Sequence, residues 1–448
     1  MVDVVYDYDV IIIGGRPAGA ALAGWLGKRG LRVLLLERGT FPSLPAVSSP
    51  IIYAPTMRLL DEIGAREEDY ARATPRLSRM VQALREDLQF AIPIPDYKGR
   101  DYAYAVDRAR FDAALWDAAL RFPSVTGEQG FNVNDLLIDA DGRVTGVTGT
   151  DAERVARRCT APLVVGADGR YSLVARKMNA AEHDVHEEAP TTIYYAYWRG
   201  LAPHDDHGPL AISYAGSRPG VGYLVMDSAD ATAAVVVEGR SDIMDDAGGD
   251  ARAFYLNLLA EAPLLARRLE HAELVTSVRG MKRIGNLYRQ AGGPGWALVG
   301  DAYHQKDPLD GQGIYNAVFG AKALAAAIIR WRAGEFADWQ TALDWYDETV
   351  RIKTYSMYRA LLARVQSSLY APPPPDWLMN SALKWILDDS QLKDLLGKLM
   401  TRQIPTDAAN LMTAPVMVGA LMRGGLREMR QRVTQSLPRP PLFKEPSR

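Results

Sequence analysis

Three stretches of the chain, far apart in sequence, combine glycines with acidic residues in a pattern that suits a sugar-phosphate ligand. The first runs from IIIGGRPAGA to Glu37, the second contains VVGADGR, and the third contains VGDAYHQKDPLDGQG. Glycine lets a backbone approach a phosphate or a flat ring, because no side chain stands in the way. A carboxylate accepts hydrogen bonds from the hydroxyl groups of a ribose. The three stretches therefore predict the binding of a dinucleotide.

The first stretch has the order of elements that dinucleotide binding requires. Val10 to Ile13 is an apolar, β-branched run that predicts a buried parallel strand. Pro17 suits the first turn of a helix that ends near Gly30, and a second strand then ends at Glu37. The start of the helix is expected to face a pyrophosphate, and Glu37 a ribose. The candidate cofactor-binding residues here are Gly14, Gly15, Arg16, Ala18, Gly19, Glu37 and Arg38.

Arg16 departs from the expected motif. In G-x-G-x-x-G the outer glycines are Gly14 and Gly19, but the middle position is Arg16. The backbone can still approach a phosphate there if the Arg16 side chain points away, and otherwise its charge faces the phosphates.

The second and third stretches also follow apolar runs that predict buried strands, Leu163 to Val165 and Trp296 to Val299. Turns at the carboxyl ends of parallel strands meet in one crevice, so we expect all three stretches to lie together. A helix is expected from Gly313 to Arg332, and its positive end would stabilise negative charge on a bound ring. The candidate cofactor-binding residues here are Asp168, Gly169, Gly300, Asp301, Pro308, Gly311, Gln312, Gly313 and Ile314.

The pattern predicts an α/β fold with a Rossmann-like dinucleotide-binding domain, an inserted antiparallel β-sheet domain for the substrate, and a helical C-terminal extension. Short β-rich runs between residues 190 and 240 predict the inserted sheet. The dinucleotide-binding domain is expected in residues 1–75, 100–185 and 280–335, and the sheet domain in residues 76–99 and 186–279. Residues 336–435 are expected to be mainly helical, and residues 436–448 to form a disordered tail.

Over about residues 8–335 the chain resembles the FAD-dependent monooxygenases of the aromatic-hydroxylase type, a superfamily that also contains flavin-dependent halogenases and geranylgeranyl reductases. The second stretch matches D-G-x-x-S-x-x-R, from Asp168 to Arg176. The third matches G-D-A-x-H followed by P and G-x-G, from Gly300 to Gly313. Arg108, in VDRARFD, resembles an arginine that contacts FAD in that family.

The resemblance implies a cofactor, electron donors and a reaction. FAD is the expected cofactor, and NADH or NADPH supplies electrons directly or through a separate flavin reductase. The expected reaction is hydroxylation of an aromatic or polyketide-like small molecule by oxygen, through a C4a-hydroperoxyflavin that survives only where water is excluded. The aromatic residues expected to line the substrate pocket are Tyr53, Tyr195, Tyr197, Tyr214 and Tyr223.

The third stretch also supplies the candidate catalytic residues His304, Pro308 and Asp310. His304 has a suitable pKa to activate a phenol as a base, whereas the resemblance places it at the edge of the flavin in a structural or cofactor role. Asp310 is an unusual acid so close to a flavin ring. Its side chain either interacts with substrate or flavin, or turns outward and caps the helix that follows.

Composition and charge exclude several classes of function. The formal net charge of −2 gives no indication of nucleic-acid binding. The single cysteine, Cys159, excludes the disulfide-reductase flavoproteins, and six scattered histidines show no metal-ligand spacing. No apolar run reaches the roughly 18 residues of a membrane span, and the N-terminus lacks the features of a signal peptide. We therefore expect a cytoplasmic protein without a metal.

Other functions fit the same motifs. A prenyl-chain reductase would use reduced flavin to saturate alkenes without oxygen. A halogenase needs a relay lysine, but the W-x-W-x-I-P motif is absent and Lys98 is the one lysine between Lys28 and Lys177. A non-enzymatic FAD-binding redox sensor is a further alternative. The C-terminal helices are candidates for homodimerisation or for covering the pocket.

Overall fold

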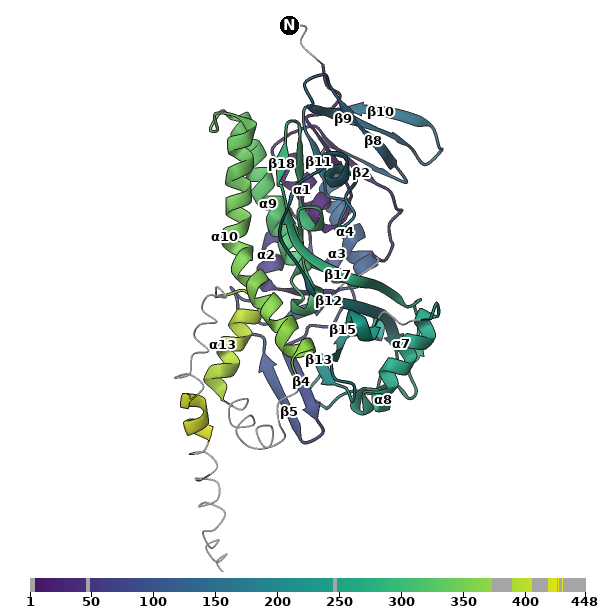
Figure 1. Cartoon of the computed structure of the whole chain (residues 1–448), viewed down its shortest axis with the longest axis vertical. Coiled ribbons are helices and arrows are strands. Elements are labelled where there is room, and N and C mark those ends of the chain that lie inside the picture. Colours follow the sequence, from purple (N-terminus) through teal and green to yellow (C-terminus); the bar gives the residue numbers. More distant parts are fainter. Residues whose placement is uncertain are drawn as a thin grey trace, which may run out of the picture.

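The structure is a computed structural model that describes residues 5–45, 49–244, 248–372, 389–404 and 418–424, together with Leu426 and Met429. Two sheets of different character organise the molecule, and Figure 1 shows helices α9 and α10 running along one side of it. The predicted α/β class with an antiparallel sheet is confirmed. The residues 436–448 predicted to form a disordered tail lie outside the described residues.

The first sheet has six strands in the order β18-β19-β11-β1-β2-β7, and it is parallel except for the edge pair β18–β19. Its central strands are buried on both faces because they consist of Val, Ile and Leu. The strand bounds are β1 (Val10–Ile13), β2 (Val33–Glu37), β7 (Val125–Gln129), β11 (Val164–Gly166), β18 (Gly292–Gly293) and β19 (Trp296–Leu298).

A group of packed helices and a small three-stranded sheet both contact this sheet. Helix α1 packs against α9 and α4, and α10 packs against α9. The long helix predicted from Gly313 to Arg332 is α9, with those bounds. The helices of this half are α1 (Pro17–Gly27), α2 (Ala54–Glu62), α3 (Glu67–Tyr70), α4 (Arg108–Leu120), α5 (Leu173–Lys177), α9 (Gly313–Arg332) and α10 (Trp339–Val365).

The second sheet has nine strands in the order β20-β17-β12-β15-β14-β13-β4-β5, with β16 paired to β12. It is antiparallel except where β13 and β4 run parallel. The strand bounds are β4 (Arg79–Arg85), β5 (Leu88–Pro93), β12 (Glu182–Arg199), β13 (Ala211–Ala215), β14 (Val221–Asp227), β15 (Thr232–Arg240), β16 (Glu273–Leu274), β17 (Arg279–Arg289) and β20 (His304–Gln305).

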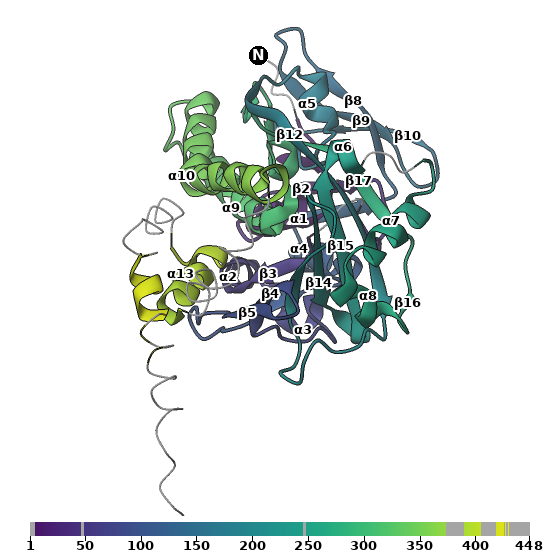
Figure 2. The ribbon, with the colours of Figure 1, turned by 60° about the horizontal axis from the view of Figure 1, so that its bottom comes forward.

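The two faces of this large sheet have separate apolar clusters. The outer face packs under α6 (Ser241–Met244), α7 (Ala251–Ala260) and α8 (Pro263–Leu269), which Figure 2 shows on the side away from α10. The inner face forms a cluster with the short pair β3 (Ile51–Tyr53) and β6 (Ala103–Ala105). The inner face is therefore the one turned toward the first sheet's helices and turns.

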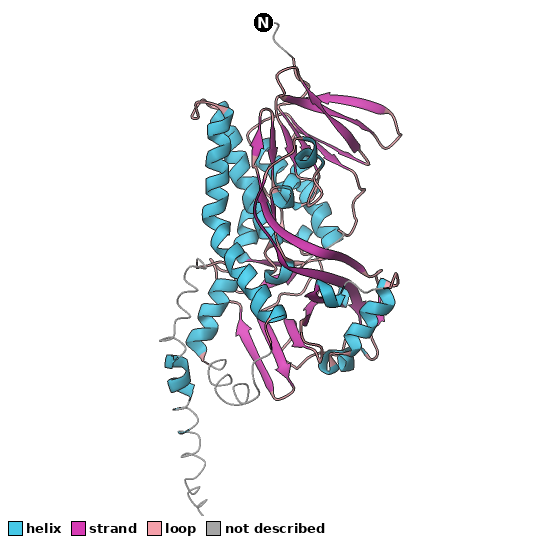
Figure 3. Ribbon diagram, in the orientation of Figure 1, coloured by secondary structure: helices cyan, strands magenta, loops and turns pink. Residues whose placement is uncertain are grey.

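Smaller elements complete the chain. A three-stranded sheet, β8 (Asn132–Ile138), β9 (Val144–Thr150) and β10 (Ala156–Thr160), lies at one end of the molecule, and Figure 3 shows it as a separate group of strands. The remaining short elements are η1 (Ala229–Ala231), η2 (Gly300–Ala302), η3 (Pro308–Asp310) and the π-helical turn η4 (Gln366–Tyr370). Of the predicted helical extension, α10, η4 and α13 (Ser390–Met400) fall in the described part.

Candidate active site

The three glycine-rich turns follow β1, β11 and β19, which are neighbours in the parallel sheet. The turns are also packed on one another. A Cβ atom on Gly14 would lie 2.4 Å from the carbonyl oxygen of Ala167, and one on Gly300 would lie 2.8 Å from Cβ of Ala18. Glycine is required at both positions because the backbones approach this closely, and Gly14 and Gly300 also have positive φ angles.

Glu37 ends β2 and turns its carboxylate back onto the first turn. One oxygen accepts from the backbone N–H of Gly15 and the other from that of Gly39, each at 2.8 Å. The Glu37 side chain is thus held between the glycine turn and its own strand end. This is the position expected of an acid that meets a ribose, whereas the neighbouring Arg38 is exposed.

Arg16 is directed toward α4. Its guanidinium donates to Asp112 at 2.5 Å and to the Ser43 backbone carbonyl and hydroxyl. Arg108 donates to both oxygens of the same fully buried Asp112, at 3.0 Å. The Asp112 carboxylate therefore binds both Arg16, which replaces a glycine of the motif, and Arg108 at the start of α4.

Helices α1 and α9 begin without a side chain that caps them. Neither Arg16 nor Gln312, at the two N-cap positions, accepts a hydrogen bond from the first turn. By contrast Asp107, Ser172 and Asp338 cap α4, α5 and α10. The free first-turn N–H groups of α1 and α9 are available to anionic or carbonyl groups of a ligand. Gly313, the first residue of α9, has no atom within 4 Å of the place a Cβ would take, so a flat ring has room there.

The second and third turns are connected by Arg170. Its Nε lies 3.3 Å from an Asp301 carboxylate oxygen, and its guanidinium donates to the Lys306 carbonyl. Gln305 donates in turn to the Arg170 carbonyl at 2.8 Å. The Asp301 side chain keeps 39% of its surface exposed, so it can accept hydrogen bonds from a ligand. Gly169 also faces open space, which leaves this edge accessible.

Comparison with known proteins identifies the site. The family model described as an FAD-binding domain matches residues 7–352. This chain belongs to that FAD-binding family. A curated relative is the 1H-pyrrole-2-carbonyl-(peptidyl-carrier protein) brominase of Pseudoalteromonas luteoviolacea, which is 25% identical over 75% of this chain and 80% of the relative. Squalene epoxidase 2 of Arabidopsis thaliana is 27% identical over 68% of this chain and 51% of the relative.

A solved structure has the same fold. The flavin-dependent brominase Bmp2 superposes with a TM-score of 0.74 over 95% of this chain and 99% of that chain, at 19% identity. The protein is an FAD-dependent oxidoreductase, as the motifs predicted, and the predicted relationship to monooxygenases, halogenases and reductases is confirmed.

The residues at the sheet edge fit FAD. Two helix starts present free N–H groups, Glu37 and Asp301 present carboxylates at two separate strand ends, and Gly313 leaves room for a ring. Asp168, which is half-buried, has one carboxylate oxygen without a hydrogen-bond partner among the described residues, although its other oxygen accepts from the Leu173 N–H. Burial raises the pKa of Asp168. Individual FAD contacts remain predictions for the residues named above.

The loop between Gly300 and Gly313 holds a buried ion pair that the sequence analysis did not predict. The Lys306 ammonium donates to both oxygens of Asp310, and both side chains are nearly buried. Asp310 also accepts from the Gln312 N–H at 3.0 Å, next to the start of α9. Pro308 begins η3, which Asp307 caps. The spacing of four residues between Lys306 and Asp310 is the sequence feature that could have predicted this ion pair.

His304 is enclosed by aromatic rings. Its imidazole stacks on the Tyr288 ring with centroids 3.8 Å apart, and the Tyr358 ring meets its edge. Burial and the nearby cations Lys306 and Arg402 lower the pKa of His304 well below its ordinary value. The imidazole is therefore neutral at pH 7, and neither ring nitrogen has a hydrogen-bond partner in the described part of the chain.

The five candidate pocket tyrosines divide between the two faces of the large sheet. Tyr53, Tyr195 and Tyr197 lie in the inner apolar cluster, with the Tyr195 and Tyr197 rings in edge contact. Tyr214 and Tyr223 face each other across β13 and β14 in the outer cluster, under α7 and α8. The structure thus brings three of the five together. The inner cluster also contains Ile51, which contacts the third glycine-rich turn, because a Cβ on Gly311 would lie 2.7 Å from the Ile51 side chain.

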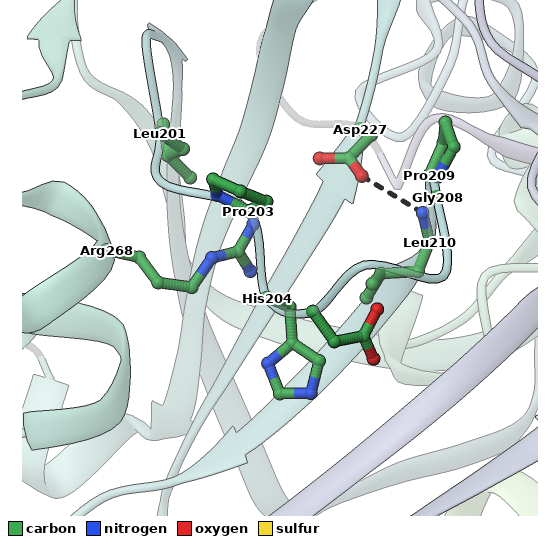
Figure 4. Close-up of a pocket in the computed structure, with 9 residues that line it drawn as sticks. Leu201, Pro203, His204, Gly208, Pro209, Leu210, Asp227 and Arg268 are labelled. Atoms are coloured by element: carbon green, nitrogen blue, oxygen red, sulfur yellow. Dashed lines mark hydrogen bonds between the residues drawn. The ribbon is translucent and has the colours of Figure 1, made fainter.

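A cavity of about 260 Å³ lies by the outer face, away from the glycine turns. Figure 4 shows Arg268 reaching toward it and Asp227 accepting from the Leu210 N–H. The Arg268 guanidinium also donates to the Tyr214 hydroxyl at 2.7 Å, so this cavity, rather than the flavin site, is the neighbour of Tyr214. Within the described residues no cluster of histidine, cysteine and acidic side chains is arranged to hold a metal ion. No helix in the same set is long and apolar enough to cross a membrane.

Proposed function

We propose that the protein is an FAD-dependent monooxygenase that hydroxylates an aromatic or polyketide-like small molecule. The observation that carries this proposal is that the start of α9 lies next to the inner face of the large sheet. The uncapped start of α9, where a flavin ring has room, lies beside an inner face of aromatic and aliphatic side chains at Ile51, Tyr53, Tyr195 and Tyr197. Such a wall suits an apolar ring and keeps water from the reacting atoms.

The overall reaction balances as follows. One substrate C–H bond becomes C–OH, one oxygen atom of O₂ enters the product, the other leaves as water, and NADH or NADPH supplies the two electrons. Bound FAD supplies the redox chemistry that activates oxygen. The electrons arrive either from the nicotinamide directly or through a flavin reductase.

The residues of this chain have defined tasks in the proposed reaction. The first-turn N–H groups of α9 stabilise negative charge in front of Gly313. The three inner tyrosines bury their rings, and their hydroxyls are already engaged: Tyr53 with Met80, Tyr195 with the Pro45 carbonyl and Tyr197 with the Val106 carbonyl. They therefore orient a substrate by shape. His304 lies in the same loop, and because burial and nearby cations lower its pKa, its imidazole opposes protonation and serves the cofactor or the fold rather than acting as the base.

Halogenation is a second candidate, because the relatives include a pyrrole-carbonyl brominase and a buried lysine lies in the flavin-facing loop. Two features disfavour it. Lys306 is paired with Asp310, and Lys98 lies in the exposed turn between Tyr97 and Arg100. A relay lysine must instead present a free amine to the substrate.

Oxygen incorporation separates the candidates. The FAD-loaded enzyme is incubated with NADH or NADPH, with and without a flavin reductase, under ¹⁸O₂ and with a panel of phenols and polyketide-like aromatics. A product heavier by one ¹⁸O supports the proposal. A brominated product formed only when bromide is present supports halogenation, and anaerobic saturation of an alkene establishes a reductase. Oxidation of the nicotinamide with no modified product from any member of the panel contradicts the proposal.

A further inference from the structure

Arg402 is a cation whose guanidinium nitrogens are buried and meet no acid within hydrogen-bond distance in the described part of the chain. It lies in the turn after α13, and the three nitrogens of its guanidinium are buried although the residue as a whole is partly exposed. None of its three nitrogens has a hydrogen-bond partner among the residues that the structure describes. Burying a charge is unfavourable unless it is paired and hydrogen-bonded, so this guanidinium needs an anion. Burial lowers the pKa of Arg402, and the nearby Asp310 carboxylate and Tyr315 phenol offset this effect only in part.

The surroundings of Arg402 belong to the flavin-facing end of α9. Its guanidinium lies over the Tyr315 ring, 4.4 Å from the centroid, and Tyr315 is the third residue of α9. It is also close enough to Lys306 and His304 to lower the pKa of both. Among the described residues of this region, the Arg402 guanidinium and the His304 imidazole both lack hydrogen-bond partners.

The turn that carries Arg402 is anchored on both sides. The Gln312 side-chain amide, at the N-cap of α9, donates to the Met400 carbonyl at 2.7 Å. On the other side of Arg402, the Gln403 amide donates to the Pro95 carbonyl at 3.0 Å, and α13 packs on β5. The guanidinium is therefore held in place by its backbone, and Met400 contributes to the inner apolar cluster beside the pocket tyrosines.

The charged side chains of the neighbouring loop are engaged with other groups of this chain. Lys306 and Asp310 neutralise each other through their ion pair. His304 is neutral because its pKa is lowered by burial. Asp307, the other buried acid of this loop, accepts from the Thr191 hydroxyl and the Leu309 N–H. Arg402 has no hydrogen-bonded acid among the described residues, and Met400 of the same turn packs against the inner apolar cluster, which suits a ligand with a negative charge and an aromatic body. A planar guanidinium with parallel N–H groups fits the two oxygens of a carboxylate.

We propose that Arg402 binds the carboxylate of the substrate, so that the enzyme acts on an aromatic carboxylic acid. This inference rests on the proposed monooxygenase function for its substrate class, but the binding event itself needs neither oxygen nor turnover. This proposal gives the C-terminal segment a role in the site, because α13 and the turn after it position Arg402, which binds the substrate carboxylate.

The test titrates the oxidised, FAD-loaded enzyme with benzoate and 2-naphthoate and with their neutral amides, and follows the flavin absorbance. At least one acid is expected to bind wild type more than tenfold tighter than its amide. Arg402→Gln is expected to weaken binding of that acid by about 10- to 100-fold, the range for a charge-assisted hydrogen bond, and to leave the affinity for the amide unchanged. Arg359→Gln, an exposed arginine of α10, is the matched control and is expected to change neither.

Three results would overturn the inference. The first is that neither acid binds better than its amide. The second is that Arg402→Gln loosens FAD itself, measured by fluorescence of released flavin, which would assign the guanidinium to the cofactor. The third is that sodium bromide, but neither acid, perturbs the flavin in an Arg402-dependent way. A structural role is tested separately with Arg402→Met, which is expected to keep or raise the melting temperature because it removes an unpaired buried charge. Failure of hydroxylation with intact acid binding would reject the proposed function and leave the carboxylate site standing.

Discussion

The Arg16 guanidinium donates to the Asp112 carboxylate across 2.5 Å, and this contact explains how an arginine occupies the middle of a glycine motif. The long side chain extends to α4 and the Ser43 segment, so the backbone around it remains available to a phosphate. Asp112 balances Arg16 and Arg108 together, although it carries a single negative charge. The motif is thus completed by a residue that lies 96 positions away.

Replacing Arg16 with glycine is expected to have little effect on FAD affinity. The change restores G-x-G-x-x-G and removes a side chain that points to α4, so FAD should bind within about tenfold of wild type, or 1.4 kcal/mol. Gly19→Ala is the contrasting variant, since its Cβ would lie 1.8 Å from the Gly14 carbonyl oxygen. Isothermal titration of the apoprotein with FAD measures both. A loss of affinity with Arg16→Gly as large as that with Gly19→Ala would show that the guanidinium contacts the phosphates.

Asp310→Asn is expected to destabilise the protein by about 3–5 kcal/mol, because it leaves the Lys306 ammonium buried without its countercharge. Removing both charges in Lys306→Met/Asp310→Leu is expected to recover most of this loss. Urea unfolding followed by tryptophan fluorescence gives both free energies of unfolding. Equal destabilisation by the single and double variants would show that the unpaired Lys306 ammonium is not the source of the loss.

His304 makes stability depend on pH. Its pKa in the folded protein is well below the ordinary value of 6.5. Between these two pKa values the imidazole is protonated in the unfolded chain and neutral in the folded chain. The contribution of His304 is therefore fully present above pH 6.5 and falls by about 1.4 kcal/mol per pH unit below it, until the folded pKa is reached. His304→Phe keeps the stack on Tyr288 and should flatten the stability profile between pH 6.5 and 5. An unchanged slope in this variant, measured by urea unfolding at each pH, would contradict the assignment.

Two matched Tyr→Phe variants test which face of the large sheet forms the pocket. Tyr195→Phe removes a 2.7 Å hydrogen bond to the Pro45 carbonyl and should cost about 1 kcal/mol of stability. Because it alters the inner wall, it should also change the affinity for an aromatic ligand. Tyr223→Phe removes a buried hydroxyl that has no partner among the described residues, and should change neither stability nor affinity. A larger effect on ligand affinity from Tyr223→Phe would place the pocket on the outer face.

The sequence by itself determined the cofactor half of the molecule. Strand β1 and helix α9 have the bounds that their residues predicted. The three turns meet because neighbouring parallel strands must end at the same edge, and this follows from local patterns alone. Apolar β-branched runs and glycine-rich turns predict strands and tight turns from neighbouring residues alone, without knowledge of the rest of the chain.

The tertiary structure alone decided the substrate half. Alternation along β12 puts Tyr195 and Tyr197 on the same face, but only the pairing of β13 with β14 and β4 placed Tyr214 and Tyr223 on the opposite face. The partners of Arg16 and Arg402, and the neutral state of His304, depend on residues distant in the chain that the fold brings together. Burial and charge at such positions are set by long-range packing, and no local spacing of residue types encodes them.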